Sequence, residues 1–207
     1  MILNDNQIRA RCEWTDQPPM ISPYTYAQCR AHVVVDNPLK LSSQTVPVIS
    51  YGQSSYGYDI RLGRNLQIFT RLTPDEIDPK AFNDNCIDEL DLESPCPGVE
   101  YFTLPQFGSA LGHSVETLHL PDDIFALCVG KSTYARCGLI VNTTPLEPGW
   151  RGQLVIEIHN TTPLPIRVYA NEGIAQLVFF KGDRPSVTYG DRAGKYQGQT
   201  GITTARV

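Results

Sequence analysis

Short apolar segments separated by turn-forming residues recur through the second half of this chain. Each segment has four to seven residues rich in β-branched or aromatic side chains, and proline, aspartate, asparagine or glycine stands between neighbours, as at 121–123 and 171–173. The predicted strands are Tyr101–Leu104, Ser114–Leu120, Ile124–Val129, Gly138–Asn142, Gln153–His159, Pro165–Tyr169 and Ile174–Phe180. In a chain of 207 residues with 16 glycines and 16 prolines, this spacing predicts a mainly β fold, built as a sandwich, a jelly roll or a distorted barrel.

The first half of the chain predicts only short peripheral elements. Residues 4–12 fit a short helix, and the apolar, mostly β-branched Val46–Ile49 fits a short edge strand. Residues 72–100 are rich in Asp, Glu, Pro and Asn, so we expect a surface excursion with about one helical turn near Pro79–Phe82. A chain of this length is expected to form one domain, 1–207, which can bury roughly 70% of its unfolded surface.

Charge and cysteine usage exclude several classes of protein. The formal net charge is −5 and the pI is about 5.3, whereas a general nucleic-acid binder would more often be basic. No apolar run approaches the length of a membrane span, and the opening residues carry no signal-peptide pattern. The six cysteines include no C-x-x-C pair, and none of the four histidines begins an H-x-E sequence, which argues against zinc. We therefore expect a reduced, cytoplasmic protein that binds neither nucleic acid nor membranes.

The sequence GKST at 130–133 matches the end of a phosphate-binding P-loop, G-x-x-x-x-G-K-[ST]. The first glycine of that pattern would fall on Phe125, and the residues that follow allow about one helical turn before another strand, so the P-loop interpretation fails. Two cations, Lys131 and Arg136, together with hydroxyls and loop amides could still hold phosphates or a polarised carbonyl. An ordinary polar loop between strands is the alternative.

Glu157 interrupts the apolar strand QLVIEIH. Strand alternation places Val155, Glu157 and His159 on one face and the aliphatic residues between them on the other. That face could simply be exposed to solvent. Alternatively, Glu157 lines a pocket, where desolvation would raise its pKa above the reference of about 4.3 and allow it to accept and return a proton near neutral pH.

The C-terminal residues 181–207 form a basic, glycine-rich segment. They contain five basic and two acidic side chains, a side-chain balance of +3 in a chain of −5, and glycines at 190, 194, 198 and 201. We expect this segment to be flexible until something holds it.

Four long motifs occur in order along the chain. They are SSYGYDIRLG at 54–63, VGKSTYARCGLIVNTTPLEPGWRGQLVIEIHNTT at 129–162, YANEGIAQLVFF at 169–180 and DRAGKYQGQTG at 191–201. Together they resemble the deoxycytidine triphosphate (dCTP) deaminases, a branch of the dUTPase superfamily, and the resemblance is weakest across 64–100. It implies a dUTPase-like distorted β-barrel or jelly roll with short peripheral helices.

The resemblance implies hydrolytic deamination of dCTP to dUTP and ammonia, which supplies dUMP and dTTP synthesis, without a catalytic protein-bound metal. Glu157 would be the general base and acid, Ser132 would help to position the water, and Arg136 would keep the site ordered. Mg²⁺ would be bound through the substrate triphosphate, so no protein metal ligand is assigned. Substrate contacts are assigned by resemblance to Lys131, Ser132, Thr133, Tyr134, Ala135, Arg136, Val155, Ile156, Glu157, Gln176, Tyr189, Lys195 and Gln199.

The same resemblance implies a homotrimer with its sites between subunits, dTTP as a feedback inhibitor, and a segment 181–207 that closes over the nucleotide. Three alternatives remain. A pure dUTPase is disfavoured because Gly149 and Trp150 stand where its I-D-x-D-Y-x-G motif has the activating Asp and the Tyr. A bifunctional deaminase and diphosphatase, giving dUMP and pyrophosphate, would carry an Asp where this chain has Glu147. A non-catalytic nucleotide-binding β-trimer would bind without turnover.

Overall fold

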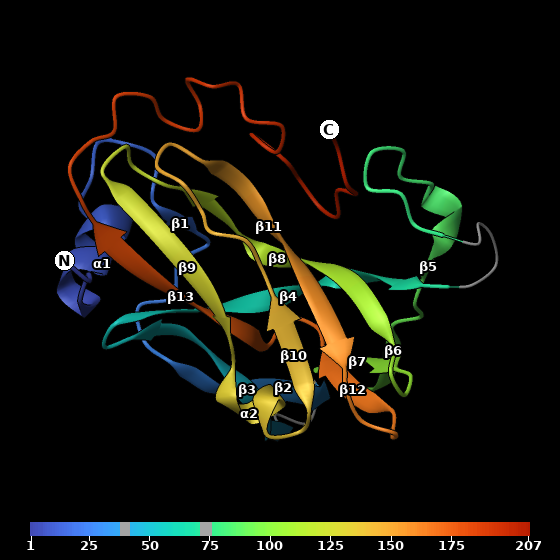
Figure 1. Ribbon diagram of the computed structural model, residues 1–207. Coiled ribbons are helices and arrows are strands. Elements are labelled where there is room, and N and C mark those ends of the chain that lie inside the picture. Colours follow the sequence, from blue (N-terminus) through green and yellow to red (C-terminus); the bar gives the residue numbers. More distant parts are fainter. Residues whose placement is uncertain (38–41, 71–75) are drawn as a thin grey trace.

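The computed structural model describes residues 1–37, 42–70 and 76–207. Within these residues, antiparallel pairing joins ten strands into one sheet, with the central order β10-β11-β8-β4-β13-β9 (Figure 1). A smaller sheet has the order β12-β7-β6. The strands of the large sheet are β1 (Ile21–Ser22), β2 (Cys29–Asn37), β3 (Ser42–Ser54), β4 (Gly57–Phe69), β5 (Ile87–Glu89), β8 (Ser109–His119), β9 (Ile124–Gly130), β10 (Leu139–Asn142), β11 (Arg151–Asn160) and β13 (Gly173–Lys181). Those of the small sheet are β6 (Glu93–Cys96), β7 (Val99–Leu104) and β12 (Ile166–Tyr169).

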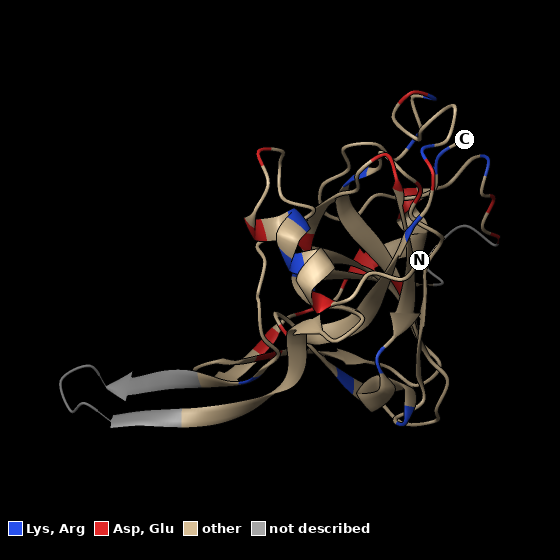
Figure 2. Cartoon of the chain, turned by 90° about the vertical axis from the view of Figure 1, so that its left-hand side faces the viewer, with Lys and Arg blue, Asp and Glu red and all other residues tan. Residues whose placement is uncertain are grey.

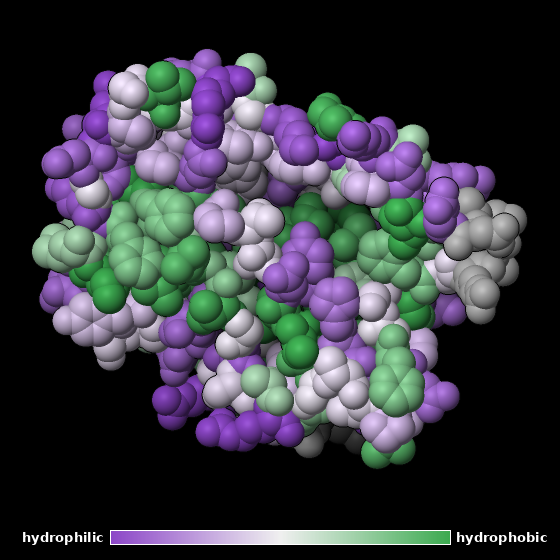
Figure 3. Space-filling model, in the orientation of Figure 1, coloured by the Kyte–Doolittle hydropathy of each residue, from purple (hydrophilic) through white to green (hydrophobic). Residues whose placement is uncertain are grey.

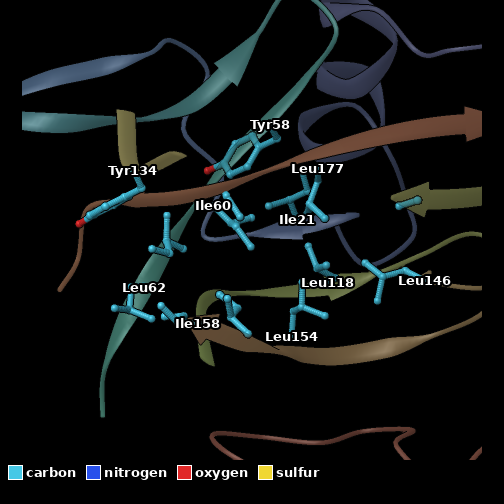
Figure 4. Packing of buried hydrophobic residues seen from close by; sticks show 14 of the residues in the cluster. Ile21, Tyr58, Ile60, Leu62, Leu118, Tyr134, Leu146, Leu154, Ile158 and Leu177 are labelled. Carbon is cyan, nitrogen blue, oxygen red and sulfur yellow. The ribbon is translucent and has the colours of Figure 1, made fainter. Parts of the chain in front are cut away.

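The large sheet curls around a single apolar core. The long strand β4 pairs with β13 along its first part and with β8 along its second, with a register shift between Leu62 and Leu66, so it links the two halves of the sheet. Leu177 and Ile60 from one half meet Leu118 and Ile158 from the other (Figure 4). All four side chains are fully buried, so their contact contributes to the hydrophobic stabilisation of the fold.

All seven predicted strands of the second half exist, and the mainly β fold is confirmed. Burial along β11 alternates as predicted, because Leu154, Ile156 and Ile158 are buried and the residues between them are only partly covered. The boundaries differ by a few residues, most at β8, which begins at Ser109 rather than Ser114.

The prediction of a short edge strand at Val46–Ile49 was wrong in extent. These residues belong to the 13-residue strand β3, which pairs first with β2 and then, at Gly52–Ser54, with β4. The described parts of β2 and β3 leave the body of the molecule side by side (Figure 2). Paired backbone groups keep β3 extended well beyond its apolar centre, which is why the local sequence underestimated it.

The helices are short and peripheral, as expected. Helix α1 (Asp5–Glu13) begins with a capping box, in which the Asn4 side chain accepts a hydrogen bond from Gln7 N at 3.0 Å. Helix α2 (Ser132–Ala135) is the single turn predicted after GKST. The helical turn expected near Pro79–Phe82 lies slightly later, as the 3-10 helix η1 (Asp84–Cys86), and the excursion also contributes β5 and β6 to the sheets. Residues 72–75 of that excursion lie outside the described residues.

The C-terminal segment, residues 182–207, contains no helix or strand. It runs back to the start of β11, where Gly152 and Gln199 form a parallel β-bridge (Figure 1). No described helix has both the length and the apolar character that a membrane crossing requires.

Candidate active site

A cavity of about 290 Å³ lies between the outer face of β8 and β11 and the C-terminal segment. Apolar side chains are visible in the hollow beneath this segment (Figure 3). The lining comes from five parts of the chain that are separated in the sequence. It consists of Phe69, Phe82, Leu111, Thr144, Pro145, Leu146, Glu147, Trp150, Leu154, Val155, Glu157, Tyr189, Tyr196, Gln199, Thr203, Thr204 and Ala205.

The sheet register places Glu157 in the floor of this cavity. Glu157 lies opposite Asn142 on β10 and Leu111 on β8, and Leu111 in turn lies opposite Gln67 on β4. Because directly opposed residues share a face, the Glu157 side chain points away from the core, beside that of Leu111. Rigid strands on both sides therefore fix the position of the carboxyl group.

The surroundings of Glu157 make its ionised form unfavourable. Its Oε2 atom is buried and has no hydrogen-bond partner among the described residues. Burial raises the pKa of Glu157 above its usual value, and a hydrogen bond with the backbone only partly opposes the rise. Burial also raises the pKa of the nearby Cys128 thiol to about 12, with a contribution from the charge of Glu157. A carboxyl group whose pKa is raised in this way is suited to taking up and returning a proton.

Four of the residues predicted to bind substrate meet at this cavity, namely Val155, Glu157, Tyr189 and Gln199. Tyr189 N donates to Pro148 O at 2.9 Å, and Gln199 Nε2 donates to Gln153 O at 2.8 Å, so hydrogen bonds to the turn before β11 and to β11 itself hold both residues. Ile156 lies beside them in β11, but its side chain is buried in the core, which leaves only its backbone for contacts.

The predicted residues 131–136 lie outside the cavity, around α2. Ser132 and Arg136 are exposed there, while the Tyr134 hydroxyl accepts a hydrogen bond from Tyr169 N at 2.8 Å and is buried. The Lys131 ammonium group binds the Asp59 carboxylate at 2.6 Å, and both side chains are almost completely buried. Within one chain, the structure therefore does not bring this segment to Glu157.

Two further predicted residues also lie elsewhere. Gln176 on β13 donates to Ser54 Oγ at 3.0 Å. Lys195 is exposed, and its ammonium group donates to the Arg206 carbonyl at 2.6 Å. The side chains of Gln176 and Lys195 therefore each have a hydrogen-bond partner within the same chain.

Sequence reasoning missed the aromatic lining of the cavity. Phe69 ends β4, Phe82 belongs to the excursion before η1, Trp150 is nearly buried, and Tyr196 comes from the C-terminal segment. Trp150 lies within the motif LEPGWRG, which was the one available signal. The described residues contain no group of three or more His, Cys, Asp or Glu side chains arranged to hold a metal ion.

The chain is similar to proteins of one known family. The model of the dCTP deaminase-like family matches residues 34–182. A dCTP deaminase of Campylobacter lari is 52% identical over 162 residues, which cover 77% of this chain and 83% of the relative. A dCTP deaminase of Herpetosiphon aurantiacus is 51% identical over 161 residues, covering 77% and 84%.

A solved structure provides an independent comparison of the fold. The crystal structure of 2′-deoxycytidine 5′-triphosphate deaminase from Agrobacterium tumefaciens superposes with a TM-score of 0.52 at 21% sequence identity. The match covers 87% of this chain and 48% of that one, so the present chain spans about half the length of the solved protein. The predicted fold class, dUTPase-like and mainly β, is confirmed.

Proposed function

Because this chain belongs to the dCTP deaminase family, we propose that it hydrolyses dCTP to dUTP and ammonia. The observation that carries the proposal is the Glu157 carboxyl group, buried in a largely apolar cavity with one oxygen atom that has no partner among the described residues. A single carboxyl group can serve every proton transfer of this reaction if the water is already oriented.

The proton transfers balance with Glu157 as base and acid. Glu157 takes a proton from water while the water oxygen bonds to C4 of cytosine, and the carboxyl group then delivers that proton to N3. The proton of the new hydroxyl group passes through Glu157 to the exocyclic nitrogen, the C4–N bond breaks, and ammonia leaves. Acid–base assistance of this type contributes about 10²–10⁴-fold. Fixing the water beside apolar walls would supply much of the remainder.

The complete site in this proposal joins neighbouring chains of a homotrimer. Ser132 and Arg136 are exposed on α2, outside the cavity that holds Glu157. Leu127 and Val129 on β9 and Ile140 on β10 are exposed apolar side chains. Burying these side chains against a neighbour would stabilise an oligomer and supply the two missing polar groups.

The nucleotide would enter as its Mg²⁺ complex, with the ion on the triphosphate oxygens. Residues 181–207 would close over it, and dTTP, which shares the triphosphate and a pyrimidine base, would compete as a feedback inhibitor. In one chain the Glu147 carboxylate forms an ion pair with Arg192 of the C-terminal segment. We therefore propose a monofunctional deaminase, in which Glu147 pairs with Arg192 and does not act as a second base.

Product analysis tests the function. Purified protein is incubated with dCTP and Mg²⁺, and dUTP, dUMP and pyrophosphate are resolved by ion-exchange chromatography. We expect dUTP and ammonia to accumulate in equal amounts. Glu157→Gln should still bind dCTP and lose turnover by about 10²-fold or more. Glu93→Gln, at an exposed position on β6, controls for the loss of one negative charge.

Each other outcome has a definite meaning. Direct release of dUMP and pyrophosphate would replace the monofunctional proposal by a bifunctional one. Binding of dCTP without any product would make the protein a nucleotide-binding module. Undiminished turnover by Glu157→Gln would remove Glu157 from its assigned role.

A further inference from the structure

The turn that leads into β11 contacts the C-terminal segment at almost every residue. We call residues 147–153, EPGWRGQ, the cradle. Three hydrogen bonds join backbone groups. Tyr189 N donates to Pro148 O at 2.9 Å, Gly198 N donates to Arg151 O at 2.8 Å, and Gln153 N donates to Gln199 O at 2.9 Å. Four more hydrogen bonds involve side chains. Gln197 Nε2 donates to Gly149 O at 2.9 Å, and Arg151 N donates to Gln197 Oε1 at 3.1 Å. Gln199 Nε2 donates to Gln153 O at 2.8 Å, and Gly201 N donates to Gln153 Oε1 at 2.7 Å.

The backbone of the cradle is shaped for this contact. Gly152 has a φ of +141°, and a Cβ atom at this position would lie 2.7 Å from Gln199 O and 3.0 Å from Gln199 N. Gly152 and Gln199 form a parallel β-bridge. The two backbones can approach this closely only because residue 152 has no side chain.

Two glutamines share most of the polar contacts, one on each side. Gln153 uses its backbone N–H, its carbonyl and its side chain on the C-terminal segment, and its Nε2 is anchored to Ser114 O at 3.0 Å. Gln197 reaches the opposite way, to Gly149 and Arg151. The ion pair between Glu147 and Arg192 is about half exposed, so solvent weakens it.

Residues held in this way also line the cavity. Tyr189, Tyr196 and Gln199 belong to the segment that the cradle fixes, and Tyr196 N donates to the Tyr189 hydroxyl at 3.1 Å. We propose that the Gln153 side chain, anchored on Ser114 O, is a positioning group that holds the C-terminal segment at Gly201 and thereby keeps Gln199 and the neighbouring tyrosines over the Glu157 cavity. This inference rests on the proposed function, since it assigns to the cradle the placement of nucleotide-binding groups.

Two reciprocal substitutions test it. Gln153→Met and Gln197→Met keep the side-chain length. The first removes the bond from Gly201 N and the anchor to Ser114 O, and the second removes both bonds of the Gln197 side chain, while the backbone bonds between Gln153 and Gln199 stay in place. Each loses about two hydrogen bonds, so each should raise KM for dCTP about tenfold and leave kcat within about threefold. Hydrogen exchange of the peptide around Gly198–Gly201, without nucleotide, should accelerate about tenfold in both variants. Arg184→Gln, which removes the exposed ion pair with Asp122 outside the cradle, should leave both measurements unchanged.

The pattern across variants decides the result. A raised KM in Gln153→Met with unaltered behaviour of Gln197→Met would indicate a local defect of β11 and overturn the proposal. Unchanged exchange in both variants would show that the cradle does not hold the segment, and would also overturn it. If the unaltered protein does not turn over dCTP, the proposed function fails. Accelerated exchange in both variants would in that case still establish that the cradle holds the segment. If the exchange accelerates but dCTP binds equally well to the variants and the unaltered protein, the positioning role is rejected.

Discussion

The Glu157 carboxyl group is held where ionisation is unfavourable, and this has a consequence for stability. Burial raises its pKa in the folded protein above the unfolded value of about 4.3. The folded state therefore binds the proton more tightly than the unfolded state, and stability falls as the pH rises through the window between the two pKa values. Above that window, the ionised carboxylate costs the protein stability.

Glu157→Gln should therefore be more stable than the unaltered protein at pH 8. The gain should be at most about 1 kcal/mol, because the group is only partly withdrawn from water, which corresponds to a Tm higher by about 2 °C. The difference should shrink as the pH falls below about 4.3, because the unfolded chain then also takes up the proton. Thermal unfolding from pH 4 to pH 8 measures it, with Glu93→Gln as the control for charge. A variant less stable than the parent at pH 8 would contradict the proposed cost.

At the scale of elements, the ion pair between Lys131 and Asp59 fastens the start of α2 to β4. Their side chains are 10% and 4% exposed, and Gln28 Nε2 adds a hydrogen bond of 3.0 Å to the same Asp59 oxygen atom. Asp59→Asn leaves a buried ammonium group without its counter-charge and should lower the free energy of unfolding by about 3 kcal/mol. Adding Lys131→Met should recover part of that loss.

Urea unfolding of the single and double variants measures the coupling between these two residues. Arg64→Gln is the matched control, since Arg64 pairs with Glu100 at 2.7 Å but is 60% exposed, and its loss should cost less than about 1 kcal/mol. Equal losses in the Asp59 and Arg64 variants would show that the buried pair has no special role in holding α2.

Two shielded ion pairs, Lys131–Asp59 and Arg61–Glu116, show why local sequence patterns predicted the strands of the second half but not β4. The strands of the second half follow from apolar alternation, which is a local property. Strand β4 was not among the predicted strands, and its charged residues Asp59 and Arg61 interrupt the apolar pattern. Both are in fact shielded, Asp59 by Lys131 and Arg61 by Glu116 at 2.7 Å, and these partners lie 72 and 55 residues away in the sequence.

Some residues of the candidate site could be predicted from the sequence, and others could not. Glu157 could be singled out from sequence, since a carboxylate in an apolar strand is unusual. The aromatic lining could not, because Phe82 and Tyr196 reach the cavity only through tertiary packing. Lys131 was assigned to the nucleotide by resemblance, and the local sequence gave no sign that Asp59 binds its ammonium group.

For the whole molecule, the separation of Glu157 from Ser132 and Arg136 predicts that one chain is not a complete enzyme. Light scattering should give a mass about three times the 23.0 kDa of the chain. A stable monomer that deaminates dCTP would contradict the proposal that each site draws residues from two chains.

Complementation tests the shared site directly. Glu157→Gln and Arg136→Ala should each be inactive as homotrimers. When the two variants are co-assembled in equal amounts, roughly a quarter of the sites should combine an intact Glu157 with a neighbour's intact Arg136, and that share of the activity should return. If both residues act within one chain, every site in the mixture carries a defect and no activity returns. Mixing either variant with itself is the control, and co-assembly is verified by recovering both chains through a tag on one.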